Sequence, residues 1–379
     1  MGNFQISDGN LTNAVGDDPT RATVSGVSIH DTDKGNDNLA FGDVGDSSAR
    51  KETDTPELTL QKSVFRNGRF VNPWPSWKDP TLGRFLNYLL FSKDHSNIPN
   101  KEELDRQLPI LRPDFDLLSK PPERGIRTTW IGHATVLIQM EGASVLMDPV
   151  FSERCSPSQW FGPKRFRSAA CQVDELPEIN AVLISHNHYD HLDANSVRTL
   201  NERFGPRLRW YVPLGLKSWM RDMSCDNVVE LDWWEEDVIP DVPDVKIAYC
   251  GEDSASLGDG RRFYFPGDTG YVGVMFKQIG QKYGPFDLAA LPIGAYEPRD
   301  FMSCQHCNPE EAVLIHKDLR ARQSVGIHWG TFTLANEFYL EPPQKLAEAL
   351  RKNNLTKKDF FTMNLGETRL VADECSELD

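Results

Sequence analysis

The sequence predicts an α/β protein in which two β-sheets pack together and helices cover their outer faces. Short runs rich in β-branched or aromatic residues begin at Thr128 and recur as far as Ile327, and turn residues bound most of them. Helical patterns separate the later runs, as over residues 194–204 and 271–283. Strands that are grouped first and interleaved with helices afterwards suggest two packed sheets with helices outside.

Residues 1–56 are predicted to form a disordered, acidic N-terminal tail. They are rich in Asp, Gly, Asn, Ser and Thr and show almost no apolar periodicity. Such a segment cannot bury enough surface to offset the entropy lost on ordering.

Residues 57–124 are predicted to be an N-terminal extension with an amphipathic helix, placed before a main domain at 125–379. The stretch 81-TLGRFLNYLLF-91 repeats apolar residues at helical spacing, which gives one apolar stripe. Two interpretations stay open, since the stripe can pack on the main domain or also touch lipid. Its members are Leu82, Phe85, Leu86, Leu89 and Leu90.

The main domain is expected to alternate short strands with helices. The strands are predicted at 128–131, 135–140, 144–147, 181–184, 209–212, 245–249, 262–265, 288–293 and 324–327. The helices are predicted at 194–204, 271–283 and 308–318. The last opens with Asn308 as N-cap and Pro309 at the first helical position.

The composition excludes some classes of protein. A formal net charge of -15 over 379 residues argues against a nucleic-acid partner, because phosphate recognition needs an excess of Lys and Arg. No apolar run approaches the roughly 20 residues that span a bilayer, and the N-terminus lacks the layout of a signal peptide. We therefore expect an intracellular protein, in the cytosol or on the cytosolic face of a membrane, that is not secreted.

The stretch 185-SHNHYDHLD-193 predicts a metal site. His186, His188, Asp190 and His191 follow the apolar run 181–184 directly, at the end of a buried strand where side chains can converge. Imidazole and carboxylate groups suit Zn²⁺, Fe²⁺ or Mn²⁺.

Two further segments offer ligands for the same site. In 265-FPGDTG-270, Asp268 follows a strand between flanking glycines, and a carboxylate can bridge two metals. In 324-SVGIHWGTF-332, His328 ends another buried strand. Each alone is more often a turn Asp or a packed His, but together they supply what the cluster lacks.

In this order the motifs resemble those of the metallo-β-lactamase superfamily. Longer stretches are similar to the N-acyl-phosphatidylethanolamine-hydrolysing phospholipase D family, and the resemblance runs from about Glu57 to Glu367. They are 148-DPVFSERCSPSQWFGPKRFR-167, 183-LISHNHYDHLD-193, 231-LDWWEE-236, 284-GPFDLAALPIGAYEPR-299, 305-QH-306, 328-HWGTF-332 and 341-EPP-343.

The resemblance implies a four-layer αβ/βα sandwich, with two mixed sheets flanked by helices, and a site for two zinc ions. By carry-over, His186 and His188 serve the first zinc. The second zinc is served by Asp190, His191 and His328, and Asp268 bridges both ions. Asp148 resembles the carboxylate that orients a ligand histidine from behind.

The implied activity is hydrolysis of N-acyl-phosphatidylethanolamine to N-acylethanolamine and phosphatidic acid by a metal-bound hydroxide. Gln305 and His306 match the pair that the family places beside the scissile phosphate, although without the resemblance a loop that bonds to backbone is the better interpretation. Tyr189 and Gln159 are candidate substrate contacts. The resemblance also implies a homodimer at the cytosolic face of Golgi or endosomal membranes. Candidate docking residues are Leu214, Leu216, Trp219 and Met220.

The chain departs from the family pattern at the first zinc. That zinc normally takes a third histidine, yet residues 192–267 contain none, and the chain passes directly through 250-CGEDSASLGDG-260. We therefore expect weaker binding of the first metal and an exposed sheet edge where a strand is missing. Cys250, Glu252 or Asp253 could substitute for the absent ligand.

Two other functions stay open. The chain could be a catalytically impaired variant that acts at most as a lipid-binding or dimer partner. It could also be another hydrolase of the metallo-β-lactamase fold with a different substrate.

Overall fold

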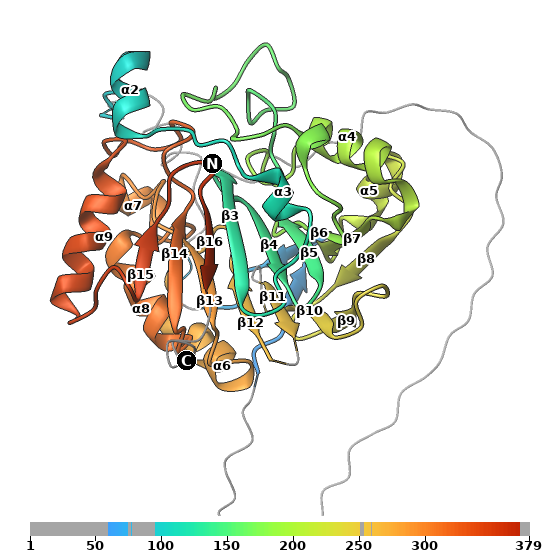
Figure 1. The fold of residues 1–379 in the computed structure, drawn as a ribbon. Coiled ribbons are helices and arrows are strands. Elements are labelled where there is room, and N and C mark those ends of the chain that lie inside the picture. The colour runs from blue at the N-terminus through green and yellow to red at the C-terminus, as the bar shows by residue number, and fades with distance from the viewer. Residues whose placement is uncertain (1–59, 75–76, 78–94, 251–253, 259, 372–379) are drawn as a thin grey trace, which may run out of the picture. The chain divides into compact units, whose positions relative to one another are not determined.

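The computed structural model describes residues 60–74, 77, 95–250, 254–258 and 260–371. These residues form two seven-stranded sheets and a two-stranded hairpin (Figure 1). The sheets share one hydrophobic core and carry helices outside, which confirms the predicted four-layer sandwich. The predicted tail and the apolar stripe of residues 81–91 lie outside the described residues.

The first sheet is mixed. Its order is β16-β3-β4-β5-β6-β7-β8, antiparallel from β16 to β5 and parallel from β5 to β8. Its strands are β3 (Ile126–Gly132), β4 (Thr135–Met140), β5 (Ala143–Met147), β6 (Ala181–Leu183), β7 (Arg209–Pro213), β8 (Val228–Leu231) and β16 (Thr368–Val371).

The second sheet is also mixed. Its order is β15-β14-β13-β12-β11-β10-β9, antiparallel from β9 to β12 and parallel from β12 to β15. Its strands are β9 (Glu236–Val238), β10 (Val245–Tyr249), β11 (Ser254–Gly258), β12 (Arg262–Phe265), β13 (Leu288–Pro292), β14 (Gln323–Ile327) and β15 (Phe360–Thr362).

The expectation of an exposed sheet edge near residues 250–260 is wrong. β10 and β11 form an antiparallel hairpin in which Tyr249 lies opposite Ser254. β11 pairs with β12 on its other side, so the sheet is continuous there. The short segment after β10 still supplies a strand, which sequence patterns did not reveal.

Alternation along the strands divides the core between two faces of the first sheet. Val136 and Ile138 of β4 pack in the cluster between the sheets, whereas Leu137 packs in a second cluster on the outer face. Between the sheets, the rings of Trp130 and Trp329 stack with centroids 5.3 Å apart. The site elements therefore stand on a densely packed core.

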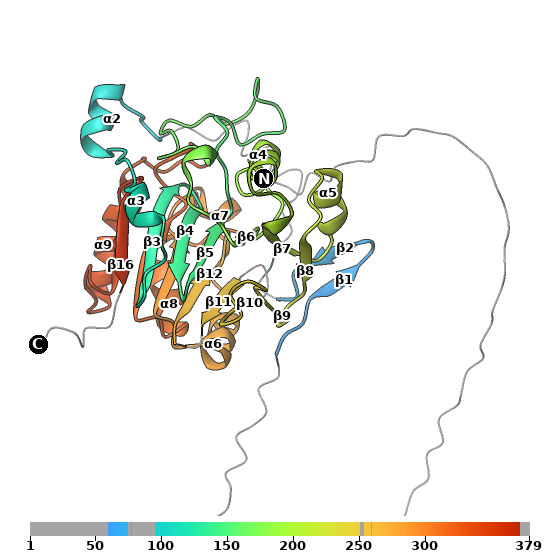
Figure 2. The same cartoon turned by 45° about the vertical axis from the view of Figure 1, so that its right-hand side comes forward.

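Helices cover both outer faces (Figures 1 and 2). α4 (Ala194–Phe204) and α5 (Lys217–Asp222) contribute to the outer cluster of the first sheet. The second sheet is covered by α6 (Gly273–Lys282), α8 (Pro309–Asp318) and α9 (Glu341–Lys352). The remaining helices of the described residues are α2 (Lys101–Gln107), α3 (Phe115–Leu118), α7 (Arg299–Met302) and the 3₁₀ turns Val173–Glu175 and Gly205–Arg207.

The described part of the N-terminal extension includes a hairpin of β1 (Val64–Arg66) and β2 (Arg69–Val71), which lies near β8 (Figure 2). The Ser63 hydroxyl donates to Asp232 Oδ2 at 2.8 Å. The Trp234 indole donates to the Gln61 carbonyl at 2.6 Å. These two bonds connect the hairpin to the segment between β8 and β9.

Side-chain caps fix the starts of two helices, and the cap at Asn308 is the one that the sequence predicts. The Asn308 side chain accepts from the Glu311 amide at 2.9 Å, and Glu311 accepts in return from the Asn308 amide at 3.0 Å. α4 begins after Asp193, whose carboxylate accepts from the amides of Asn195 and Ser196. This second cap fixes the point where the histidine-rich loop ends.

The residues near α5 that were expected to contact a membrane surface differ in how exposed their side chains are. Leu214 is 41% exposed, but Met220 is fully buried in the outer cluster, so its assignment to a docking surface is wrong. Among the described helices, none combines the length and apolar character that a bilayer crossing requires.

Gly294, two residues after the end of β13, allows the chain to approach the turn that carries His328. A Cβ at this position would lie 2.4 Å from the His328 carbonyl oxygen. We predict that Gly294→Ala lowers the free energy of unfolding by about 1–3 kcal/mol, because the two segments must separate. Gly260→Ala is the matched control, since its Cβ would meet only Glu141 Oε1 at 3.4 Å. Denaturant unfolding that shows equal stability for both variants would contradict this account.

Candidate metal centre

The candidate metal ligands gather where strands of both sheets end. The loop after β6 carries four of them, Asp268 follows β12, and His328 follows β14. His133, which follows β3, joins the same group. The site therefore draws side chains from both layers of the sandwich.

The loop after β6 is held as a tight turn. The amides of His191 and Leu192 both donate to the His188 carbonyl, at 3.0 and 2.7 Å. Just before the turn, the Tyr249 hydroxyl of β10 donates to the Ile184 carbonyl at 2.6 Å. These bonds hold the turn against the opposite sheet.

One cluster joins Asp190, His191, His328 and Asp268. His191 Nε2 and His328 Nε2 lie 3.2 Å apart, and each lies 3.4 Å from Asp190 Oδ2. Asp268 Oδ1 lies 3.1 Å from His191 Nε2 and 2.8 Å from His328 Nε2. Ligand atoms around a four-coordinate zinc are separated by about 3.3 Å, and these separations of 2.8–3.4 Å are close to that value.

A second cluster joins His186, His188 and Asp268. His186 Nε2 lies 2.9 Å from His188 Nδ1 and 3.7 Å from Asp268 Oδ2. Among the described residues this group holds two imidazoles and one carboxylate. It can hold a metal, but with fewer protein ligands than the first cluster.

Asp268 faces both clusters through different oxygens. Its Oδ1 points to His191 and His328, and its Oδ2 points to His186. Asp268 Oδ1 is buried yet accepts no hydrogen bond of normal geometry. A buried carboxylate needs compensating positive charge, which either protonated imidazoles or a bound cation would supply at this point.

Asp148 holds the cluster from behind. It is fully buried, and its carboxylate accepts from the Ser185 amide at 2.7 Å, the Ser185 hydroxyl at 2.6 Å and His191 Nδ1 at 2.6 Å. This bond fixes the His191 ring so that Nε2 faces the cluster. The arrangement matches the orienting role implied for Asp148.

The electrostatics favour a cation. Burial alone would raise the pKa of the Asp268 carboxyl, but His328 and other imidazoles outweigh it and hold that pKa well below its usual range. The pKa of Asp190 is lowered in the same way, mainly by His191. Burial would lower the pKa of His328, but the two carboxylates raise it to about 9. Metal binding at this cluster therefore releases protons.

His306 lies at the edge of the site. Its Nδ1 is buried, has no hydrogen-bond partner and lies 3.7 Å from Asp268 Oδ2. Burial lowers the pKa of His306 to about 4, so the imidazole is neutral at pH 7. Its neighbour Gln305 is half-buried, in the turn that follows α7.

The candidate substrate contacts lie on the surface. Tyr189 is 39% exposed in the loop between two ligands. The Gln159 amide is engaged within its own loop, because it accepts from the Arg154 amide and donates to the Arg154 carbonyl. Neither residue belongs to the described clusters.

Cys250 is placed away from the metal centre's described groups. Its side chain is fully buried within the core cluster between the sheets, and it belongs to none of the metal-binding groups found among the described residues. Glu252 and Asp253 lie outside the described residues. Among the residues that the structure describes, no thiol is grouped with His186 and His188.

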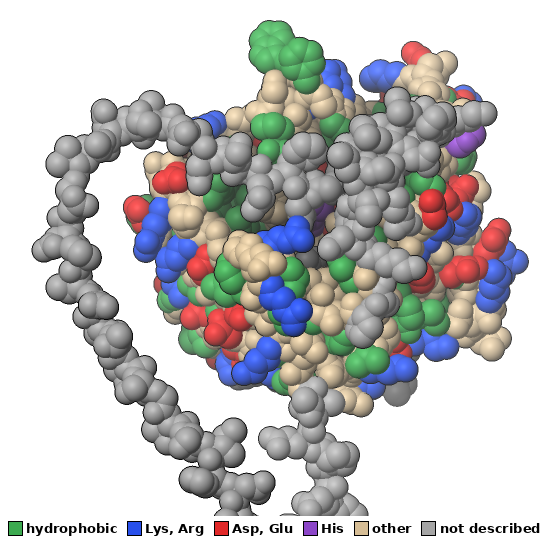
Figure 3. Space-filling model, turned by 180° about the vertical axis from the view of Figure 1, so that it is seen from behind, with side chains coloured by type: hydrophobic (Ala, Val, Ile, Leu, Met, Phe, Trp, Pro, Cys, Tyr) green, Lys and Arg blue, Asp and Glu red, His purple; other side chains and the backbone are tan. Residues whose placement is uncertain are grey.

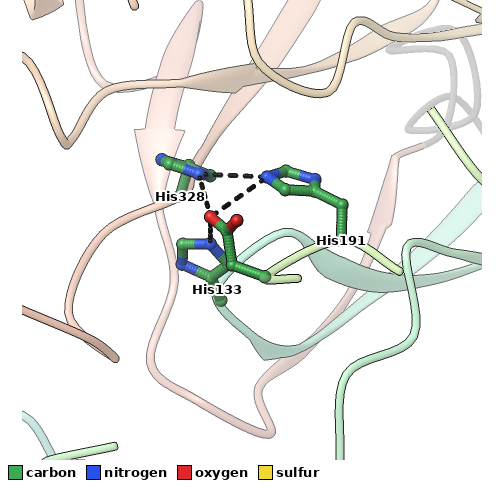
Figure 4. Close-up of side chains that lie close together, drawn as sticks. His133, His191 and His328 are labelled. Carbon is green, nitrogen blue, oxygen red and sulfur yellow. Dashed lines mark hydrogen bonds and ion pairs between the residues drawn. The ribbon is translucent and has the colours of Figure 1, made fainter. Parts of the chain in front are cut away.

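His133 is a site residue that sequence reasoning missed. Its Nε2 lies 3.0 Å from Asp190 Oδ2, and its ring centroid lies 4.0 Å from that of His328 (Figure 4). Burial, followed by the effect of His328, lowers the pKa of His133 to about 3, so its imidazole is neutral. The available signal was a lone histidine directly after a predicted strand.

Comparison with known proteins identifies a related domain and a related fold. Residues 143–329 match the beta-lactamase superfamily domain. An isothiocyanate hydrolase from Delia radicum gut bacteria superposes with a TM-score of 0.52 at 19% identity, covering 65% of this chain and all of that one. This likeness concerns the fold alone.

Two curated relatives are closer in sequence. The chain is 41% identical over 332 residues to N-acyl-phosphatidylethanolamine-hydrolyzing phospholipase D 1 of Caenorhabditis elegans, covering 80% of this chain and 92% of that protein. It is 30% identical over 381 residues to the mitochondrial N-acyl-phosphatidylethanolamine-hydrolyzing phospholipase D of Saccharomyces cerevisiae, covering 84% and 80%. The chain therefore belongs to the N-acyl-phosphatidylethanolamine-hydrolysing phospholipase D family of the metallo-β-lactamase superfamily.

Proposed function

We propose that the chain is a zinc-dependent phosphodiesterase that hydrolyses N-acyl-phosphatidylethanolamine to N-acylethanolamine and phosphatidic acid. The kinship with the Caenorhabditis elegans enzyme, at 41% identity across most of both chains, carries the proposal. The two His/Asp clusters that share Asp268 supply donors of the right chemistry.

The residues divide into two roles. Asp190, His191 and His328 would hold one zinc, His186 and His188 the other, and Asp268 would bridge them. When bound, zinc supplies an activated water at neutral pH and positive charge beside the phosphodiester.

His306 is suited to contact the substrate. As a neutral imidazole it can donate an N–H to a phosphate oxygen or to the leaving oxygen of the ethanolamine arm. Its unpaired Nδ1 lies beside Asp268, where that contact is needed. Hydrolysis breaks the bond from phosphorus to the ethanolamine oxygen, which leaves as the alcohol after taking a proton.

A second candidate function has one specific observation in its favour. The cluster of His186 and His188 holds no third imidazole among the described residues, and no histidine occurs from 192 to 267. A chain that holds one metal well and the other poorly would be catalytically impaired, and would act at most as a lipid-binding or dimer partner.

The proposed substrate is a membrane lipid, and the loop of residues 151–167 is suited to contact a membrane. This loop rises above β4 and β5 in Figure 1. At its tip Trp160 is 85% exposed and Phe161 is 78% exposed. Figure 3 shows hydrophobic side chains projecting at this upper end of the molecule. Large exposed aromatic side chains suit the interface of a bilayer.

This loop is anchored beside the metal centre. The Ser152 hydroxyl donates to Asp193, the cap of α4 directly after the histidine loop, at 3.0 Å. Arg165 Nε donates to the Ser152 carbonyl at 2.8 Å, and its guanidinium lies over the Phe332 ring. We infer that the aromatic tip inserts into the membrane that contains the lipid substrate.

The first prediction concerns metal and turnover. The purified chain should contain zinc and release N-acylethanolamine. His328→Ala should lower the activity by more than the roughly 10–100-fold that is typical when a residue that only orients a ligand is lost. Elemental analysis and product quantification check both. Zinc at or below one per chain with no product, together with activity restored by a longer loop that carries a histidine, would instead support the impaired variant.

The second prediction concerns His306. His306→Ala should lower kcat by about 100-fold, because a donor to the reacting phosphate is lost. Zinc content should stay unchanged, since His306 is not among the assigned ligands. An unchanged kcat would remove His306 from the assigned role.

The third prediction concerns the loop tip. The double variant Trp160→Ala, Phe161→Ala should bind vesicles of phosphatidylcholine and phosphatidic acid at least about 10-fold more weakly. The reason is that two aromatic side chains that would be buried in the bilayer are lost. Cosedimentation measures this without any substrate. Val274→Ala on α6 is the control, being 61% exposed at the opposite end of the domain (Figure 1). Equal vesicle binding by the double variant and the control would exclude the loop tip as the docking element.

A further inference from the structure

The backbone of His133 is fixed by groups that surround the ligand His328. Its amide donates to the Thr331 hydroxyl at 2.9 Å. Its carbonyl accepts from the Trp130 indole at 2.8 Å and from the His328 amide at 3.0 Å. The turn that presents His133 and the turn that presents His328 therefore form one hydrogen-bonded unit.

The His133 side chain is directed at Asp190. It is 2% exposed, and its Nε2 lies 3.0 Å from Asp190 Oδ2. The edge of the Phe332 ring packs against the His133 ring, with centroids 5.2 Å apart at 89°. Packing and hydrogen bonding leave the imidazole little freedom to turn away.

Asp190 Oδ2 is also the oxygen that faces the metal cluster. It lies 3.4 Å from both His191 Nε2 and His328 Nε2, and Figure 4 shows His133, His191 and His328 converging on one carboxylate. A carboxylate ligand that keeps a hydrogen bond from a buried donor is held in the orientation that binds the metal.

We propose that His133 is a positioning residue that holds the Asp190 carboxylate toward the metal bound by His191, His328 and Asp268. The inference rests on the proposed metal binding at this cluster but not on the lipid substrate. Direct ligation by His133 is the competing arrangement, because its nitrogen lies within 4.8 Å of the other donors in the group.

Cobalt binding by the full chain separates these arrangements. His133→Ala should lower Co²⁺ affinity by about 10–100-fold in competition with a chelator. His133→Gln should restore most of the affinity, because its amide N–H can reach Asp190, whereas the shorter His133→Asn should not. The absorption bands of the Co²⁺-saturated protein should stay unchanged in all three variants.

His316→Ala is the matched control. His316 is a buried histidine of α8 that bonds to the Ser324 hydroxyl at 2.8 Å and belongs to none of the described metal groups. It should leave Co²⁺ affinity unchanged even if it lowers the melting temperature.

The glutamine variant decides the question if His133→Ala does not fold.

Three results would overturn the proposal. They are wild-type affinity in His133→Ala, no recovery in His133→Gln, and altered absorption bands at saturation, which would mark His133 as a direct ligand. A wild-type chain that binds no Co²⁺ would sink this inference and the proposed function together. A wild-type chain that binds Co²⁺ without hydrolysing N-acyl-phosphatidylethanolamine would sink the proposed function alone.

Discussion

The carboxylate of Asp268 connects the two halves of the site. It reaches the site from β12 of the second sheet, and it contacts His191 from the first sheet as well as His328 from its own. One buried group thus depends on the register of both layers. Because an uncompensated buried carboxylate is costly, a cation bound at this point would stabilise the packing of both sheets. The pairing of β12 with β13 positions Asp268, and the hydrogen bonds of the histidine loop position His191 opposite it.

The fold could be predicted largely because its strands and caps obey local rules. The apolar runs 135–140 and 181–184 predicted the strands β4 and β6. Asn308 and Asp193 cap helices because their side chains accept from the first free amides. β11 could not be foreseen, since Ser254–Gly258 is a weak strand former on its own and pairs because β10 and β12 offer open edges on both sides. Met220 was misplaced because α5 is too short for its periodicity to show which face is buried.

The site was predictable where ligands are adjacent in sequence and less so where they meet only in space. His186, His188, Asp190 and His191 stand in one turn, and strand ends pointed to Asp268 and His328. His133 gave no such signal, since a single histidine after a strand has no distinctive spacing and its contact with Asp190 spans the fold. The suggestion of Cys250 relied on proximity along the chain, but burial in the core governs where that thiol lies. The homodimer stays a prediction.

Tyr249 has a consequence for how this protein could change. Its hydroxyl donates to the carbonyls of Ile184 and Tyr211, and so acts as a strut from the second sheet to the first. It is the last residue of β10, and only residues 250–253 separate it from β11. A longer segment inserted after Cys250 would leave both contacts of the strut untouched. The hydrogen bonds that Tyr249 makes to the strands of the first sheet therefore do not depend on the length of the segment that joins β10 to β11.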